Sequence, residues 1–149
     1  MKTLSQINEF IDAQPIAIAG VSRNPKKFGY TVFKELKEKG MKVIPLNPAA
    51  DQILGEKSYS TVKSLPDEVK ALIILTKKDQ TASLIREAKE KGIKQIWIQQ
   101  MADSKEALDE LRDTDINYIT GECILMHYKA NGIHKFHRAI NRLFGKFPR

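Results

Sequence analysis

Short runs of apolar, β-branched residues alternate along this chain with longer segments of helical periodicity. The runs are short and almost continuously apolar, which is typical of strands buried on both faces. Strict alternation of such strands with amphipathic helices predicts an α/β fold: a doubly wound, mainly parallel five-stranded sheet with helices on both faces. The expected strands cover residues 16–20, 41–47, 70–76, 93–99 and 116–120, and the expected helices cover residues 3–13, 28–39, 79–91, 103–113 and about 133–144. A short helical turn is expected within residues 47–69, and a further element is expected to begin at residue 121.

Length and composition fit a single domain. The chain has 149 residues, of which 42% are hydrophobic and 29% are charged, a normal balance for a globular protein. The single cysteine excludes an internal disulfide framework and is typical of a reducing compartment. No apolar run approaches the roughly 18 residues of a membrane span, and the first residues contain no signal-peptide core. We therefore expect one domain over residues 1–149 in a cytoplasmic protein without a membrane partner, and homo-oligomer formation stays open.

The charge is strongly positive and unevenly distributed. The net charge is +7, and beyond Glu122 the chain has no acidic residue, so that a basic helix is expected over about residues 132–146. Such a balance favours polyanionic partners: nucleic acid, anionic lipid or phosphorylated small molecules. We interpret the terminal helix as a solvated basic helix. Nucleic-acid binding through it is kept as a further alternative.

The loop after the first expected strand has the properties of a phosphate site. It reads GVSRNPKKFG, from residue 20 to residue 29. A glycine permits a tight turn and a close approach of the backbone to a ligand, while the following helix adds the positive end of its dipole. Gly29 stands where a close contact of that helix with a ligand or with the sheet would require a residue without a Cβ. The alternative is an ordinary strand-to-helix turn that happens to be basic. The candidate phosphate-binding residues are Gly20, Val21, Ser22, Arg23 and Lys26.

The end of the second expected strand argues against an ordinary NAD site. Dinucleotide-binding folds place an acidic residue there, which binds the ribose hydroxyls. Here the strand ends in Leu46-Asn47-Pro48, without an acid. Asn47 can donate and accept hydrogen bonds, and Pro48 offers a flat apolar face to a ligand. The same two residues are also a common turn.

Five segments, in this order, resemble a known family: AIAGVSRNPKKFGY, KGMKVIPLNP, GEKSYSTVKSLP, IWIQ and GECILM. They resemble the small stand-alone CoA-binding proteins, whose Rossmann-like domain is similar to the CoA-binding half of the succinyl-CoA synthetase alpha subunit. The likeness runs from about residue 14 to residue 128. It implies coenzyme A or an acyl-CoA as the ligand, with its phosphates facing the first loop at Gly20, Ser22, Arg23 and Lys26. It also implies that Asn47 and Pro48 border the adenosine end, and that Thr76, Lys77 and Gln99 line the rest.

The resemblance does not extend to a ligase reaction. We find neither the phosphohistidine loop nor the ATP-grasp domain that a synthetase requires, and no catalytic constellation is evident. We therefore expect a non-catalytic or regulatory binding protein. An NAD(P)- or nucleotide-linked enzyme on the same fold is the alternative.

A few residues outside these loops carry chemistry of their own. Cys123 follows the fifth expected strand; as a free cysteine it fits a buried apolar position, and a mixed disulfide with the CoA thiol is the sharper hypothesis. With His127, His134 and His137 it makes a weak metal-ligand pattern, and we expect no metal. Trp97 is expected to pack beneath a covering helix; stacking on adenine is the alternative.

Overall fold

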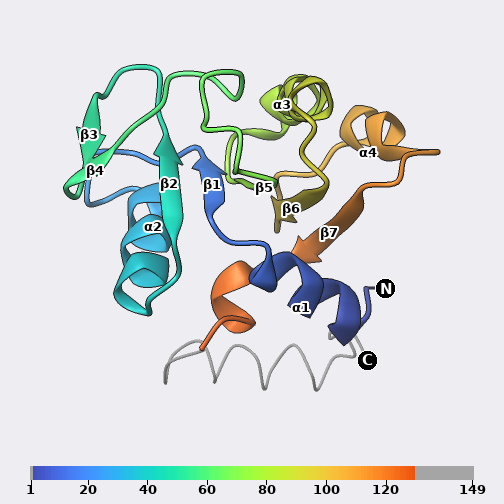
Figure 1. Ribbon diagram of the computed structural model, residues 1–149, viewed down its shortest axis with the longest axis horizontal. Coiled ribbons are helices and arrows are strands. Elements are labelled where there is room, and N and C mark those ends of the chain that lie inside the picture. The colour runs from blue at the N-terminus through green and yellow to red at the C-terminus, as the bar shows by residue number, and fades with distance from the viewer. Residues whose placement is uncertain (1, 130–149) are drawn as a thin grey trace.

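The computed structural model describes residues 2–129 as an α/β sandwich built around one central sheet (Figure 1). The expected basic helix at about residues 132–146 lies outside the described residues. None of the helices within residues 2–129 has the length and apolar content that a bilayer span requires. In chain order the elements are α1 (Leu4–Asp12), β1 (Ile16–Ala19), α2 (Phe28–Glu38), β2 (Val43–Leu46), β3 (Gln52–Ile53), β4 (Glu56–Lys57), β5 (Ala71–Ile74), α3 (Lys78–Lys91), β6 (Gln95–Gln99), α4 (Lys105–Leu111), β7 (Asn117–Glu122) and the 3₁₀ turn η1 (Ile124–Met126).

The main sheet has five parallel strands in the order β2-β1-β5-β6-β7, which confirms the predicted doubly wound architecture. The chain passes from β1 outward to β2 and then returns across β1 to β5. Because the direction of winding reverses at this point, the loops that follow β1 and β5 diverge to opposite faces of the sheet. A crevice for a ligand is therefore expected between the carboxyl ends of β1 and β5.

The two faces of the sheet pack against different helices (Figure 1). Successive side chains of a strand point to opposite faces. Ile16 and Ile18 of β1 belong to the core beneath α1 and α2, whereas Ala17 and Ala19 belong to the core beneath α3 and α4. The small alanine side chains leave room above β1 on the α3 face, which is where the site described below opens.

Trp97 packs in the core, as the sequence predicts. Its side chain is fully buried, and its ring centroid lies 5.4 Å from that of Phe10 in α1. The indole Nε1 donates a hydrogen bond to the carbonyl oxygen of Glu122, 3.1 Å away. The side chain thus joins β6 to α1 and to the end of β7.

The crossover from β2 to β5 differs from the expectation. No helix forms within residues 47–69: the segment contains the antiparallel hairpin β3–β4, which the sequence did not predict, and the expected helical turn is reduced to two overlapping hydrogen-bonded turns at residues 61–65. Leu54 and Gly55 both have positive φ, at 49° and 79°, and they form the tight turn of the hairpin. Tyr59 then pairs with Leu46 along β2. Since this crossover places no helix over β1 and β2, that part of the α3 face is bordered by loop residues instead.

Candidate functional site

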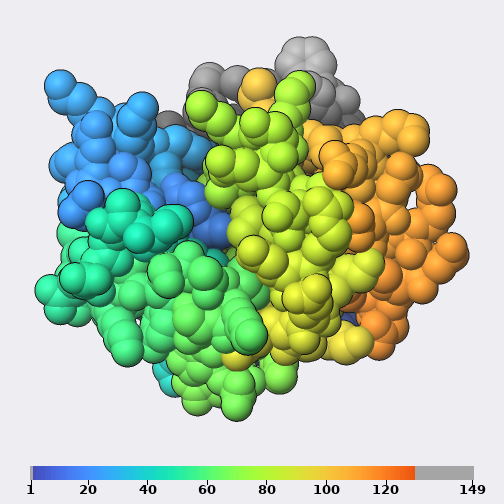
Figure 2. All heavy atoms as spheres, turned by 90° about the horizontal axis from the view of Figure 1, so that it is seen from above, coloured from blue at the N-terminus to red at the C-terminus, as the bar shows by residue number. Residues whose placement is uncertain are grey.

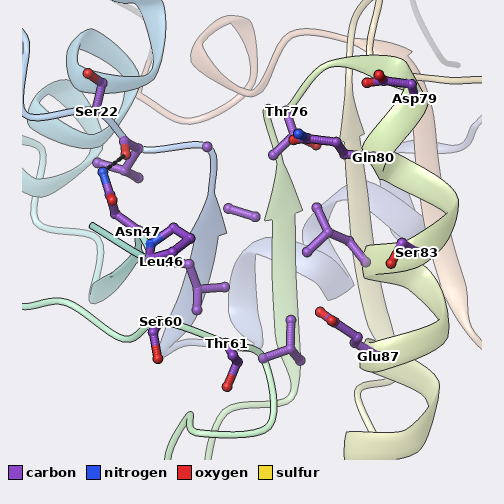
Figure 3. Close-up of a pocket in the computed structure, with 16 residues that line it drawn as sticks. Ser22, Leu46, Asn47, Ser60, Thr61, Thr76, Asp79, Gln80, Ser83 and Glu87 are labelled. Carbon is purple, nitrogen blue, oxygen red and sulfur yellow. Dashed lines mark hydrogen bonds between the residues drawn. The ribbon is translucent and has the colours of Figure 1, made fainter. Parts of the chain in front are cut away.

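A groove of about 630 Å³ opens on the α3 face at the carboxyl ends of β1 and β5, where the winding reverses. Figure 2 looks onto this side of the molecule, with the loop after β1 in blue and the 47–62 segment in green on one side, and α3 in yellow-green on the other. Figure 3 shows the side chains that line it. The lining residues are Ala19, Gly20, Val21, Ser22, Leu46, Asn47, Pro48, Ser60, Thr61, Val62, Thr76, Asp79, Gln80, Ser83, Leu84 and Glu87.

Two glycines shape the loop at the upper end of the groove. Gly20 has a φ of +93°, and a Cβ at this position would lie 3.0 Å from the backbone of Leu75 and Thr76. A Cβ on Gly29 would overlap the carbonyl oxygen of Gly20. The first turn of α2 therefore packs directly on the loop backbone, so the close contact at Gly29 is with the loop after β1, where the sequence predicted a contact with the sheet or a ligand. This packing brings the N-terminal end of α2 beside the residues that line the groove.

Ser22 is held by a local turn with its hydroxyl still able to donate. Its Oγ accepts a hydrogen bond from the backbone N–H of Asn24 at 3.0 Å, and the Asn24 Oδ1 accepts from the N–H of Lys26 at 3.0 Å. No side chain caps the start of α2 at Lys27. The first N–H groups of a helix have no partner within the helix, so they and the Ser22 hydroxyl form a donor surface suited to an anion.

Asn47 joins the two loops of this wall. Its Nδ2 donates to the carbonyl oxygen of Val21 at 2.9 Å, and its Oδ1 accepts from the N–H of Ala49 at 2.7 Å (Figure 3). Pro48 follows and lines the groove. The predicted hydrogen-bonding capacity of Asn47 is thus used within the protein, where it sets the distance between the loop after β1 and the loop after β2.

Thr76 places an unpartnered hydroxyl at the groove. Its Oγ1 is fully buried, yet among the residues that the structure describes it has no hydrogen-bond partner. A buried hydroxyl without a partner is costly, on the order of 1–3 kcal/mol. Thr76 lines the groove, but its Oγ1 has no exposed surface there, so a ligand atom reaches the hydroxyl only if the side chain rotates.

The structure brings together six of the ten predicted site residues in the groove: Gly20, Val21, Ser22, Asn47, Pro48 and Thr76. Arg23, Lys26 and Lys77 are exposed and lie in the loops that lead to it, but they are not among its lining residues. Lys77 precedes α3, whose start no side chain caps. These cations surround the groove without entering it, which places their charge in reach of an anionic group at its mouth.

Gln99 lies apart from the groove. Its side chain is 4% exposed, and its Oε1 accepts a hydrogen bond from the N–H of Ile124 at 3.1 Å. A register shift between Ile98 and Gln99 accompanies this arrangement where β6 meets β7. In the structure Gln99 therefore connects the end of β6 to η1. Its predicted contact with a ligand stays a prediction.

The opposite wall was not identified from the sequence. Ser60, Thr61 and Val62 come from the crossover, and α3 contributes Asp79, Ser83 and Glu87. The four-residue spacing of the α3 residues is a detectable signal, because it places them along one face of a helix. Nothing in the spacing alone shows that this face borders a groove.

The candidates for covalent or metal chemistry lie elsewhere. Cys123 is buried, with 8% exposure, within the core beneath α1 and α2, as the apolar interpretation predicts. The His127 Nε2 lies 3.1 Å from the Glu122 Oε2. Within the described part of the chain, no three His, Cys, Asp or Glu side chains are grouped so as to hold a metal ion, and His134 and His137 lie outside that part.

Comparison with known proteins identifies the family. The model of a CoA-binding domain matches residues 14–129. The chain belongs to this CoA-binding domain family. The match contains the whole predicted range, residues 14–128, and it includes both walls of the groove.

The family contains both enzyme subunits and small proteins. The chain is 41% identical over 93 residues to the acetate–CoA ligase [ADP-forming] II subunit alpha of Pyrococcus furiosus, which covers 62% of this chain and 20% of that subunit. It is 26% identical over 121 residues to the uncharacterized protein YneT of Bacillus subtilis, covering 80% of this chain and 90% of the other. A solved structure of a conserved hypothetical protein from P. furiosus matches with a TM-score of 0.71 and 36% identity, over 74% of this chain and 95% of that one. The chain thus spans about a fifth of the ligase subunit but nearly all of the small relatives.

Proposed function

We propose that this protein binds coenzyme A or an acyl-CoA through its phosphate and adenosine groups, as a non-catalytic or regulatory cytoplasmic binding protein. The observation that carries the proposal is the groove at the reversal of winding, with the Gly20–Ser22 loop and the start of α2 at its upper end. Membership of the CoA-binding domain family supports the choice of ligand.

The charges around the groove favour one orientation of the ligand. The pyrophosphate is proposed to lie at the N–H groups of residues 20–22 and the Ser22 hydroxyl, with Arg23, Lys26 and Lys77 around it. The adenosine then extends along Pro48 toward Val62. Thr76, whose Oγ1 is buried and unpartnered among the described residues, also lines the groove that would hold such a ligand. Gln99 is proposed to act indirectly, by positioning η1.

The ligase relatives support the ligand but not a reaction. These relatives are named as ligases of acetate and CoA, yet this chain spans only 20% of the P. furiosus subunit. A CoA ligase reaction is therefore not part of the proposal. The groove itself contains neither a cysteine nor a histidine.

A thermal-shift panel with CoA, acetyl-CoA, NAD, NADP and ATP tests the proposal. A ligand at 100 times its dissociation constant stabilises the folded state by about 2.7 kcal/mol, a shift that is readily measured. We expect CoA and acetyl-CoA to raise the melting temperature more than the other ligands at equal concentration. A shift with NAD and none with CoA would refute the proposal and favour the nucleotide-linked enzyme.

A further inference from the structure

Two exposed carboxylates line the groove: Asp79 in the first turn of α3 and Glu87 two turns later. Glu87 of α3 lines the groove, and among the residues that the structure describes no cation forms an ion pair with it. Lys91, one helical turn later, is the natural candidate for such a pair. Its Nζ donates instead to Asp67 and to the carbonyl oxygen of Lys63, each at 3.1 Å. Because Glu87 is exposed, its carboxylate needs no partner within the protein and can accept a hydrogen bond from a ligand.

The surroundings of Glu87 suit a flat, partly polar ring. Val62 and Leu46 are buried, with 1% and 5% exposure, and together with the half-buried Leu84 they make this end of the groove apolar. Figure 3 shows the Glu87 carboxylate pointing into the groove from α3, with Thr61 on the other side. Apolar walls with a few polar groups at the rim are the usual lining of a small-molecule site.

Glu87 lies two helical turns beyond the start of α3. Asp79 stands beside the mouth of the groove in the first turn of α3, and Glu87 follows eight residues later on the same face. At about 1.5 Å per residue this separation is about 12 Å. A ligand that has its pyrophosphate at the Gly20–Ser22 loop and runs along α3 would bring its base toward Glu87. A carboxylate at this position can accept hydrogen bonds from the base.

We propose that Glu87 selects the base of the ligand by accepting a hydrogen bond from the 6-amino group of adenine. A 6-oxo purine presents an acceptor at the same position, which the carboxylate repels. This inference rests on the proposed function, because it takes CoA as the ligand. It adds a residue that discriminates between purine bases, which the loop after β1 and Asn47-Pro48 are not proposed to do.

Calorimetric titration of the full chain with two ligands tests this inference. The ligands are CoA and its deaminated counterpart, in which hypoxanthine replaces adenine. For the unmodified protein we expect CoA to bind about tenfold more tightly, as a hydrogen bond to a charged group predicts. In Glu87→Gln we expect the ratio to fall to about threefold or less, because a glutamine amide can accept from the 6-amino group and can also donate to the 6-oxo group.

Glu90→Gln is the matched control, because it removes the same charge from the next turn of α3. Glu90 lines a smaller cavity beside the groove but not the groove itself, so its variant should keep the tenfold ratio. An unchanged ratio in Glu87→Gln, or an equal fall in both variants, would overturn the inference while CoA binding itself stands. If the unmodified protein binds no CoA, the proposed function fails first, and the two failures are thereby distinguished.

Discussion

At the scale of single residues, the loop after β1 depends on two missing side chains. Gly20 adopts a positive φ beside the backbone of Leu75 and Thr76, and Gly29 lets the first turn of α2 rest on the carbonyl of Gly20. The phosphate-facing loop is therefore positioned by backbone contact rather than by side-chain packing. Ser22 and Asn24 then stabilise its curve through local hydrogen bonds.

Replacement of Gly29 by alanine should destabilise the protein. A Gly→Ala change inside a helix normally stabilises it by about 0.5–1 kcal/mol. Here we expect a loss of about 1–3 kcal/mol, because the new Cβ overlaps the Gly20 carbonyl and the backbone must shift. Urea unfolding measures the change. Lys34→Ala, an exposed position in the same helix, should stay within about 0.5 kcal/mol, and a stabilised Gly29→Ala would contradict the packing described.

Variants of Ser22 and Lys26 should reveal which phosphate they contact. Ser22→Ala and Lys26→Ala are expected to weaken CoA binding by about threefold to tenfold, the range of a single hydrogen bond or exposed charge contact. A greater loss for CoA than for dephospho-CoA places them at the 3′-phosphate, and an equal loss places them at the pyrophosphate. Lys42→Ala removes an exposed charge at the amino end of β2, the opposite edge of the sheet, and should leave both affinities unchanged.

At the scale of elements, α3 has two functions on two faces. One face borders the groove, and another binds α4 through ion pairs that include Arg86–Glu110 at 2.8 Å and Lys89–Glu110 at 3.3 Å. Hydrogen bonds from Arg86, and then from Lys89, lower the pKa of Glu110 from its ordinary value of 4.5. These contacts hold α3 in place, so that the wall of the groove keeps its position when the ligand leaves.

The Glu110 contacts should contribute stability that depends on pH. Since the pKa of Glu110 is lower in the folded state, its contribution is present above about pH 4.5 and is lost as the pH falls through the folded value. Glu110→Gln should therefore lower the melting temperature slightly at pH 7, and the difference should disappear in strong acid. Thermal unfolding followed by circular dichroism at both pH values measures this. A difference that grows toward low pH would exclude the ion pair as its cause.

At the scale of the whole molecule, the doubly wound sheet concentrates polar loops at one edge in a chain of net charge +7. The winding reverses at β1, and the loops after β1, β2 and β5 meet there with the crossover between β2 and β5. The positive charge attracts polyanions of any kind, whereas the groove binds only a ligand that fits its shape. The two kinds of binding should therefore respond differently to salt.

Salt should separate CoA binding from nucleic-acid binding. We expect the CoA-induced thermal shift to persist at about 0.15 M salt, because backbone N–H groups and apolar walls contribute to it. Oligonucleotide binding through exposed cations should fall steeply over the same range, since it is driven by the release of counterions. Fluorescence anisotropy with a labelled oligonucleotide provides the comparison. Oligonucleotide binding that stays tighter than CoA binding at 0.15 M would favour the nucleic-acid alternative.

The sequence by itself determined the elements and the first wall of the site. Short apolar runs and helical spacing are local properties, so they predicted five parallel strands and the helices α1 to α4. Gly20 and Gly29 could be interpreted for the same reason, since a turn and a missing Cβ act on their immediate neighbours. Membership of the family followed from the order of these local motifs.

Only the tertiary structure decided the second wall. Val62 and Glu87 meet across one groove because the strand order places β1 beside β5, a choice that depends on burying whole faces of the sheet and not on local periodicity. The hairpin at residues 52–57 and the burial of Gln99 could not be predicted from the sequence, because both depend on contacts between separate segments. After the hairpin, Tyr59 pairs with Leu46 of β2, and Gln99 bonds to Ile124 of η1. Both contacts depend on how separate segments pack together, which no spacing rule along the chain encodes.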